Sequence, residues 1–238
     1  ARPGVELLAR VPTEDAGLVV DLGCGPGNLT ALLAERWPAA RVIGVDSSEE
    51  MAERARADHP GIEFVVADLT EWEPPGTPDV IYSNATMHWV DDHELAFGRL
   101  RSFLGPGGVL AVQMPDNWRE PTHRVPAAIL DEVGWSQAAH DALIQDRVSA
   151  ATDYQRWVQP AEVDVWRTTY YQTLTGEDPV WTWTTGSFLR PVLAEMDADE
   201  AARFEKACKA VYRSAYPPNE DGTTTLPFSR LFLIAVAT

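Results

Sequence analysis

A glycine-rich segment near the N-terminus has the residue types that could hold a small organic ligand. Residues 21–27 read Asp-Leu-Gly-Cys-Gly-Pro-Gly, after an apolar run and before a stretch with helical periodicity. A strand that ends in such a loop and opens a helix points backbone amides at a ligand and lets the main chain approach it closely. The pattern predicts a nucleotide-type cofactor, although several cofactors share it.

Asp21 narrows the choice of cofactor. In a dinucleotide enzyme a carboxylate here would repel the pyrophosphate, whereas S-adenosylmethionine has no phosphate and carries two positive groups, an α-amino group and a sulfonium. The G-x-G-x-x-G spacing also fails, because Asn28 follows Gly27. We therefore predict S-adenosylmethionine, bound by Asp21 together with Gly23, Cys24, Gly25 and Asn28.

Two further carboxylates follow strand-like runs. Asp46 ends the run 41–46, where a carboxylate can accept hydrogen bonds from both ribose hydroxyls. Asp68 ends the run 62–68 and could accept from the exocyclic amine of adenine, with Leu69 and Met51 as apolar walls. Each acid could instead cap the helix that follows it. Three acids at three successive strand ends favour the ligand interpretation.

A parallel sheet would bring these residues together. Short β-branched runs alternate with helical periodicity, which predicts strand–helix–strand units. The predicted strands are 18–22, 41–46, 62–68, 79–84 and 109–113, and the runs 163–171 and 228–236 could add a hairpin-like pair at one edge. Ser47 and Glu50 form a capping-box pair that predicts a helix start. The fold class is thus α/β, a Rossmann-like sheet that is mostly parallel with an antiparallel edge strand.

The second half of the chain differs in pattern. Beyond Glu120 the periodicity is mostly helical and irregular, and five tryptophans are concentrated there. We expect a single domain, 1–238, in which about 119–160 and 172–226 contribute a helical cap over the site of a second substrate.

Composition excludes several classes of partner. The 36 acidic and 19 basic residues give a formal net charge of −17, which disfavours nucleic acid. No apolar run approaches the roughly 18 residues of a membrane span, and the chain opens without a signal-like segment, so we predict a cytoplasmic protein that does not bind membranes. Two cysteines, Cys24 and Cys208, form neither a disulfide framework nor a zinc cage, so we predict no metal. We expect a monomer or a weak dimer.

These features resemble the class I S-adenosylmethionine-dependent methyltransferase family. Longer blocks resemble a narrower family within it, the trans-aconitate methyltransferases, and the most specific are 112–118 (VQMPDNW) and 163–171 (VDVWRTTYY). Other blocks are 2–3, 7–12, 21–28, 36–40, 46–48, 120–123, 189–191, 227–228 and 230–232, with Asn84, Ala85 and Trp89. Two stretches depart from the pattern: an aromatic-containing segment before Arg2 is missing, and 134–150 differs.

The resemblance implies methyl transfer to a carboxylate of a small polycarboxylic acid, trans-aconitate, with a monomethyl ester and S-adenosylhomocysteine as products. A carboxylate with a pKa near ~4 is ionised at neutral pH and needs no catalytic base. We therefore predict positioning groups and no catalytic residue. His88 could act as a base for a hydroxyl or amine acceptor, but we favour a role in lining the cofactor pocket with Asn84, Trp89 and Ser47.

A polycarboxylate needs local cations, and arginine matches a carboxylate bidentately. Arg167 and Arg190 are the first candidates, because they lie in family blocks of the second half. Each arginine could instead form a surface salt bridge, and Trp118 could simply pack. The further candidates for acceptor binding are Arg230, His123, Asn117, Trp118, Tyr170 and Tyr171.

Three alternatives stay open from the sequence. The acceptor could be another small molecule or natural-product hydroxyl, because acceptor pockets vary on this fold. The chain could be a nucleotide-binding oxidoreductase, against which Asp21 and Asn28 argue. It could also bind the cofactor without catalysis.

Overall fold

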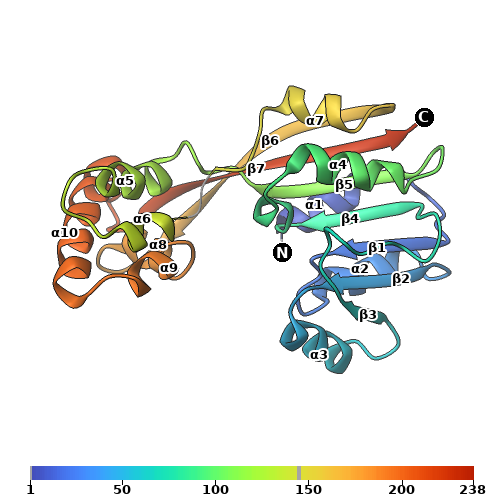
Figure 1. The fold of residues 1–238 in the computed structure, drawn as a ribbon, viewed down its shortest axis with the longest axis horizontal. Coiled ribbons are helices and arrows are strands. Elements are labelled where there is room, and N and C mark those ends of the chain that lie inside the picture. The colour runs from blue at the N-terminus through green and yellow to red at the C-terminus, as the bar shows by residue number, and fades with distance from the viewer. Residues whose placement is uncertain (1, 144–145) are drawn as a thin grey trace. The chain divides into compact units, whose positions relative to one another are not determined.

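A computed structural model describes residues 2–143 and 146–238. The described residues form two compact units (Figure 1). The first comprises 2–115, 147–168 and 230–238, and the second comprises 116–143, 146 and 169–229. The second unit overlaps the predicted cap segments, whereas 147–160 belongs to the first unit. The role of the second unit as a cap stays a prediction.

The first unit is built on a seven-stranded sheet in the order β3-β2-β1-β4-β5-β7-β6. Its pairs β3–β2, β2–β1, β1–β4 and β4–β5 are parallel and β5–β7 is antiparallel, which confirms the predicted fold class. The strands are β1 (Leu18–Leu22), β2 (Arg41–Asp46), β3 (Glu63–Val66), β4 (Val80–Asn84), β5 (Val109–Pro115), β6 (Ala161–Leu174) and β7 (Thr224–Ala237).

Helices cover both faces of this sheet (Figure 1). Helices α4 (His93–Ser102) and α7 (Ala151–Trp157) pack on the face that carries Val20, Ile43 and Leu110. The other face meets α1 (Arg2–Arg10), α2 (Asn28–Arg36) and α3 (Glu49–Asp58). The central strands are therefore buried on both sides, as their near-continuous apolar sequences require.

The sequence placed some boundaries correctly and misplaced others. Strands β1 and β2 have the predicted bounds, whereas β6 and β7 are each 14 residues long and contribute to both units. The predicted capping box at Ser47 is wrong. Ser48 is the N-cap of α3, its Oγ accepts from Met51 N at 3.3 Å, and the helix therefore begins one residue later than predicted.

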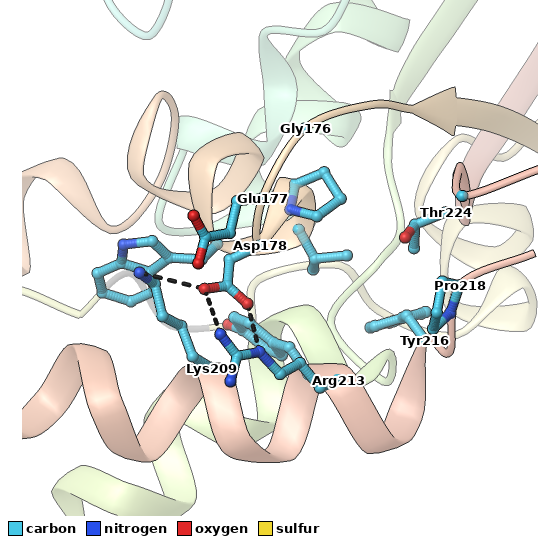
Figure 2. Close-up of a pocket in the computed structure, with 13 residues that line it drawn as sticks. Gly176, Glu177, Asp178, Lys209, Arg213, Tyr216, Pro218 and Thr224 are labelled. Carbon is cyan, nitrogen blue, oxygen red and sulfur yellow. Dashed lines mark hydrogen bonds and ion pairs between the residues drawn. The ribbon is translucent and has the colours of Figure 1, made fainter.

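The second unit contains α5 (Pro121–Leu130), α6 (Gln137–Asp141), α8 (Pro179–Thr185), α9 (Arg190–Ala194) and α10 (Ala198–Ala215). Helices α8 and α10 line a cavity of about 310 Å³ (Figure 2). Asp178, the left-handed N-cap of α8, accepts hydrogen bonds from Arg213 at 2.6 and 2.8 Å and pairs with Lys209 at 3.3 Å. These ion pairs tie α8 to α10.

Candidate cofactor site

The glycine-rich loop is fixed to the neighbouring strand. The backbone nitrogens of Gly23 and Cys24 donate to Val45 O at 2.7 and 3.1 Å. Gly23 has a left-handed φ of 71°, and a Cβ built on it would lie 2.0 Å from Thr86 Oγ1. Only glycine fits this position, so the first glycine of the motif has a structural role.

Gly25 faces open space instead. Its φ is 55°, and a Cβ built on it would meet nothing within 4 Å. Its N–H donates to Asp46 Oδ2 at 2.8 Å. The loop thus presents bare backbone beside a carboxylate, an arrangement that allows the close approach of a ligand.

Asp46 is held by the main chain at both oxygens. Oδ2 accepts from Gly25 N, and Oδ1 accepts from Ser48 N at 2.9 Å. A carboxylate offers about four lone-pair sites, so a fixed Asp46 can still accept from two ribose hydroxyls. Asp46 does not cap the helix that follows it, since the N-cap of that helix is Ser48.

Asp68 orders a turn at the same end of the sheet. Its Oδ1 accepts from Thr70 Oγ1 at 2.7 Å and Thr70 N at 2.8 Å, and these bonds lower the pKa of the carboxyl group. The next regular element after Asp68 is strand β4, so this acid does not cap a helix. It stays ionised and exposed.

A cavity of about 550 Å³ lies at the carboxyl ends of the strands, where ligands of open α/β sheets bind. Seven predicted residues line it: Gly23, Asp46, Ser47, Asp68, Leu69, Asn84 and Trp89. Seven others that the sequence analysis missed complete the lining: Val45, Ala67, Thr70, Ala85, Thr86, Val90 and Asp91. Five of them lie within two residues of a predicted strand end, which was the signal that could have found them; Val90 and Asp91 lie further along the chain and carry no such signal.

The charge of this lining bears on the choice of ligand. Among the described lining residues, Asp46, Asp68 and Asp91 are acidic and none is lysine or arginine. Such a cavity repels a pyrophosphate and attracts a cation. The residues therefore fit S-adenosylmethionine, with its sulfonium and α-amino group, and do not fit a dinucleotide.

Asn84 and Ala85 give a second indication of a ligand. Asn84 Oδ1 is buried and has no hydrogen-bond partner among the described residues. Ala85 has a left-handed φ of 57°, a conformation that costs a non-glycine residue about 1–2 kcal/mol. An unpaired acceptor and local strain in a cavity lining are typical of a binding site.

Asp21 does not line the cavity, which differs from the predicted direct contact with the cofactor. Side chains alternate along a strand, and Asp21 points toward α2, where Thr30 Oγ1 donates to its Oδ2 at 2.7 Å. The carboxyl group is 2% exposed, and burial, with a smaller contribution from Asp46, raises its pKa to about 7. Asp21 can act on the cavity through its charge.

The remaining predicted cofactor residues do not line the cavity. Cys24 packs against Ala55 and Phe64, and burial raises its pKa. Asn28 is the first residue of α2, and Met51 lies in the first turn of α3. His88 belongs to the 3-10 helix η1 (Met87–Trp89).

His88 is a poor candidate for a general base. It is 8% exposed, and burial, followed by the charges of Arg230, His93 and Arg147, lowers its pKa to about 4. Its ring centroid lies 4.7 Å from that of Trp89. An imidazole with this pKa is neutral at pH 7 and accepts a proton weakly.

The predicted acceptor residues divide between the two units. Arg167 and Arg230 belong to the first unit, and the second contains Asn117, Trp118, His123, Tyr170, Tyr171 and Arg190. In the second unit Asn117, Trp118 and His123 make the following contacts. Asn117 Oδ1 accepts from Ser229 N at 2.6 Å, Trp118 meets His123 edge-on at 5.1 Å, and His123 stacks on Phe188 at 4.2 Å.

Comparisons with known proteins show the family of this chain. Residues 19–108, which include the glycine-rich loop and all three acidic residues at the strand ends, match the model of a methyltransferase domain. A trans-aconitate 2-methyltransferase from Methylobacterium radiotolerans is 45% identical, with 98% of this chain and 92% of the relative covered. One from Escherichia coli is 44% identical over 99% of this chain and 92% of that protein.

The chain belongs to the trans-aconitate 2-methyltransferase family. A putative methyltransferase from Bacillus halodurans has the same fold, with a TM-score of 0.66 and 12% identity over 99% of both chains. Membership of the trans-aconitate 2-methyltransferase family confirms the predicted enzyme class and the cofactor S-adenosylmethionine. Within 2–143 and 146–238, no helix is both long enough and apolar enough to cross a bilayer.

Proposed function

We propose that the protein transfers the methyl group of S-adenosylmethionine to a carboxylate of trans-aconitate, giving its monomethyl ester and S-adenosylhomocysteine. The observation that carries this proposal is the 44–45% identity to trans-aconitate 2-methyltransferases over nearly the whole chain. The acidic lining of the cavity supports the choice of methyl donor.

The cofactor is held by residues at the strand ends in this proposal. Asp46, fixed at both oxygens by backbone N–H groups, accepts from the ribose hydroxyls. Asp68 and Leu69 lie beside the adenine, and Asn84 Oδ1 accepts from the α-amino group. The charge of Asp21, beneath the loop, attracts the positive end of the cofactor.

In this reaction the main task of the protein is to orient the two reacting groups. The bound cofactor supplies an electrophilic methyl group, to which a carboxylate oxygen forms a bond as the C–S bond breaks and leaves its electron pair on sulfur. The acceptor carboxyl group is already ionised at neutral pH, so no residue has to remove a proton. A neutral His88 is compatible with this scheme. Orientation of two groups in contact can supply on the order of 7–11 kcal/mol.

We propose that the acceptor carboxylates are held by arginines, with Arg190 and Arg167 as the first candidates. Both side chains are exposed in their own units. Arg190→Ala should raise the KM for trans-aconitate roughly tenfold and leave affinity for S-adenosylhomocysteine unchanged. An equal loss with an uncharged acceptor would remove Arg190 from carboxylate recognition.

The proposal extends to the cellular location and the oligomeric state of the protein. Cys24 and Cys208 are both buried and form no disulfide, as is usual in a reducing compartment. We therefore propose that the protein is cytoplasmic. We further propose a monomer or weak dimer that binds neither nucleic acid nor membranes.

The test is incubation of the purified protein with S-adenosylmethionine and trans-aconitate, followed by mass spectrometry of the product. We expect one additional methyl group, lost again on mild alkaline hydrolysis as an ester requires. Absence of the ester while another acid or a phenol is methylated would overturn the proposal.

A further inference from the structure

Buried polar atoms without hydrogen-bond partners gather at the carboxyl ends of β4 and β5. Among the described residues they include Asn84 Oδ1, His88 Nδ1 and both side-chain polar atoms of Gln113. Gln113 is 1% exposed and His88 is 8% exposed. Burial of unpaired polar groups is costly, and a ligand that supplies the missing partners is one reason that they persist.

Asn84 and Gln113 are neighbours in the sheet, and His88 belongs to the adjacent helix η1. Asn84 is the register partner of Gln113, and Ala85 N donates to Gln113 O at 2.7 Å. Helix η1, which carries His88, packs against β5. Thr86 and Trp89, on either side of His88 in the sequence, both line the cofactor cavity. His88 and Gln113 are thus next to lining residues of the cofactor cavity, His88 in the sequence and Gln113 in the sheet.

Two arginines add positive charge around this group. Arg147 donates from Nη1 to Trp89 O at 3.1 Å and pairs with Asp91 at 2.7 Å. Arg230 lies opposite Pro115 in the β5–β7 pair, two residues beyond Gln113 along β5. The charges of both arginines act on His88. Asp91 offsets part of the charge of Arg147, but both guanidinium groups lie close enough to act on a carboxylate beside the neutral imidazole.

We propose that His88 positions the acceptor: its Nδ1 donates a hydrogen bond to an acceptor carboxylate, in a field supplied by Arg147 and Arg230, with Gln113 Nε2 as a second donor. The proposal rests on the proposed function and names the residues that would hold its substrate. A carboxylate only accepts hydrogen bonds, so it can satisfy unpaired donors at this point. His88 thus changes from a cofactor-lining residue to an acceptor-binding one.

The first experiment compares His88→Leu with His88→Asn. The amide nitrogen of asparagine can occupy the position of Nδ1 and keep a donor there, whereas leucine removes it. We expect His88→Leu to raise the acceptor KM roughly 10- to 100-fold, the range of a hydrogen bond to a charged group. We expect His88→Asn to stay within several-fold of the wild type. Affinity for S-adenosylhomocysteine, measured by calorimetry, should change less than about twofold in both.

The second experiment tests the contribution of the Arg147 charge to acceptor binding. Arg147→Gln should raise the acceptor KM about 3- to 10-fold at low ionic strength and less at high salt, because salt screens charges. Arg54→Gln makes the same change of net charge on the exposed surface of α3, and it should leave the KM unchanged. Should His88→Leu fail to fold, Gln113→Met replaces it. Removal of an amide without hydrogen-bond partners should not lower the stability of the protein, and the acceptor KM should still rise.

Two results separate this inference from the proposed function. If the wild type methylates an acid other than trans-aconitate, the proposed substrate is wrong, but His88→Leu should still raise the KM for that acid. If His88→Leu weakens binding of S-adenosylhomocysteine and leaves the acceptor KM unchanged, the inference is overturned whatever the acid. A thermal shift by trans-aconitate with S-adenosylhomocysteine present, lost in His88→Leu, would support the same conclusion without turnover.

Discussion

Asp21→Asn should change how folding stability depends on pH. The buried Asp21 carboxyl group has a pKa of about 7 in the folded protein, against 3.8 ordinarily, and burial is the main cause. Between about pH 4 and pH 7 the folded state therefore keeps a proton on Asp21 that the unfolded state has already released. Stability falls with rising pH wherever the folded state binds more protons, so Asp21 destabilises the protein progressively across this window.

The size of the effect follows from the same values. One pKa unit corresponds to about 1.4 kcal/mol, so the wild type should lose about 3 kcal/mol through Asp21 between pH 5 and pH 8. Asparagine keeps an acceptor for the Thr30 hydroxyl and does not titrate. Over that range the free energy of unfolding of the variant should therefore rise by about 3 kcal/mol relative to that of the wild type. This holds whatever the difference in stability between the two proteins at pH 5.

Urea denaturation at pH 5, 6, 7 and 8 measures this difference, and contributions from other titrating groups cancel between the two proteins. Asp58→Asn, at an exposed carboxylate paired with Arg54, is the control and should follow the wild-type curve. Parallel curves for Asp21→Asn and the wild type would refute the argument. At pH 8 the variant should also bind S-adenosylhomocysteine more weakly, because the field that attracts the α-amino group is lost.

Three further predictions concern the glycine-rich loop, Asp46 beside it and the contact between helices α4 and α7. Asp46→Ala should weaken binding of S-adenosylhomocysteine by about 1–3 kcal/mol in calorimetry, and an unchanged Kd would contradict the ribose contact. Gly23→Ala should destabilise the protein by about 2–5 kcal/mol in urea, since its Cβ would lie 2.0 Å from Thr86 Oγ1 at a left-handed φ. Tyr154→Phe should cost about 2–4 kcal/mol of unfolding free energy, because it removes a hydroxyl that lies 2.7 Å from His93 Nδ1 and accepts from Ser149 N. A loss below about 0.5 kcal/mol would mean that solvent or another group replaces the hydroxyl.

Local sequence was enough to predict most of the sheet and the position of the cofactor loop. Strands β1 and β2 have their predicted bounds because each is a short β-branched run that ends at a polar residue. Asp46 and Asp68 lie beside the cavity because carboxyl ends of parallel strands meet at one edge. These properties depend on periodicity and chain direction, which the sequence contains.

The tertiary structure decided which atoms have partners. Asp21 and Asp46 look equivalent in the sequence, yet one is buried against α2 and the other is fixed by two backbone N–H groups at the cavity. Gln113 reads as an interior strand residue, and Arg147 carries no motif. Their place beside His88 depends on strand register and on a segment that returns to the first unit after the second. Burial and the pairing of charges depend on contacts distant in sequence, and these set the electrostatics of the site.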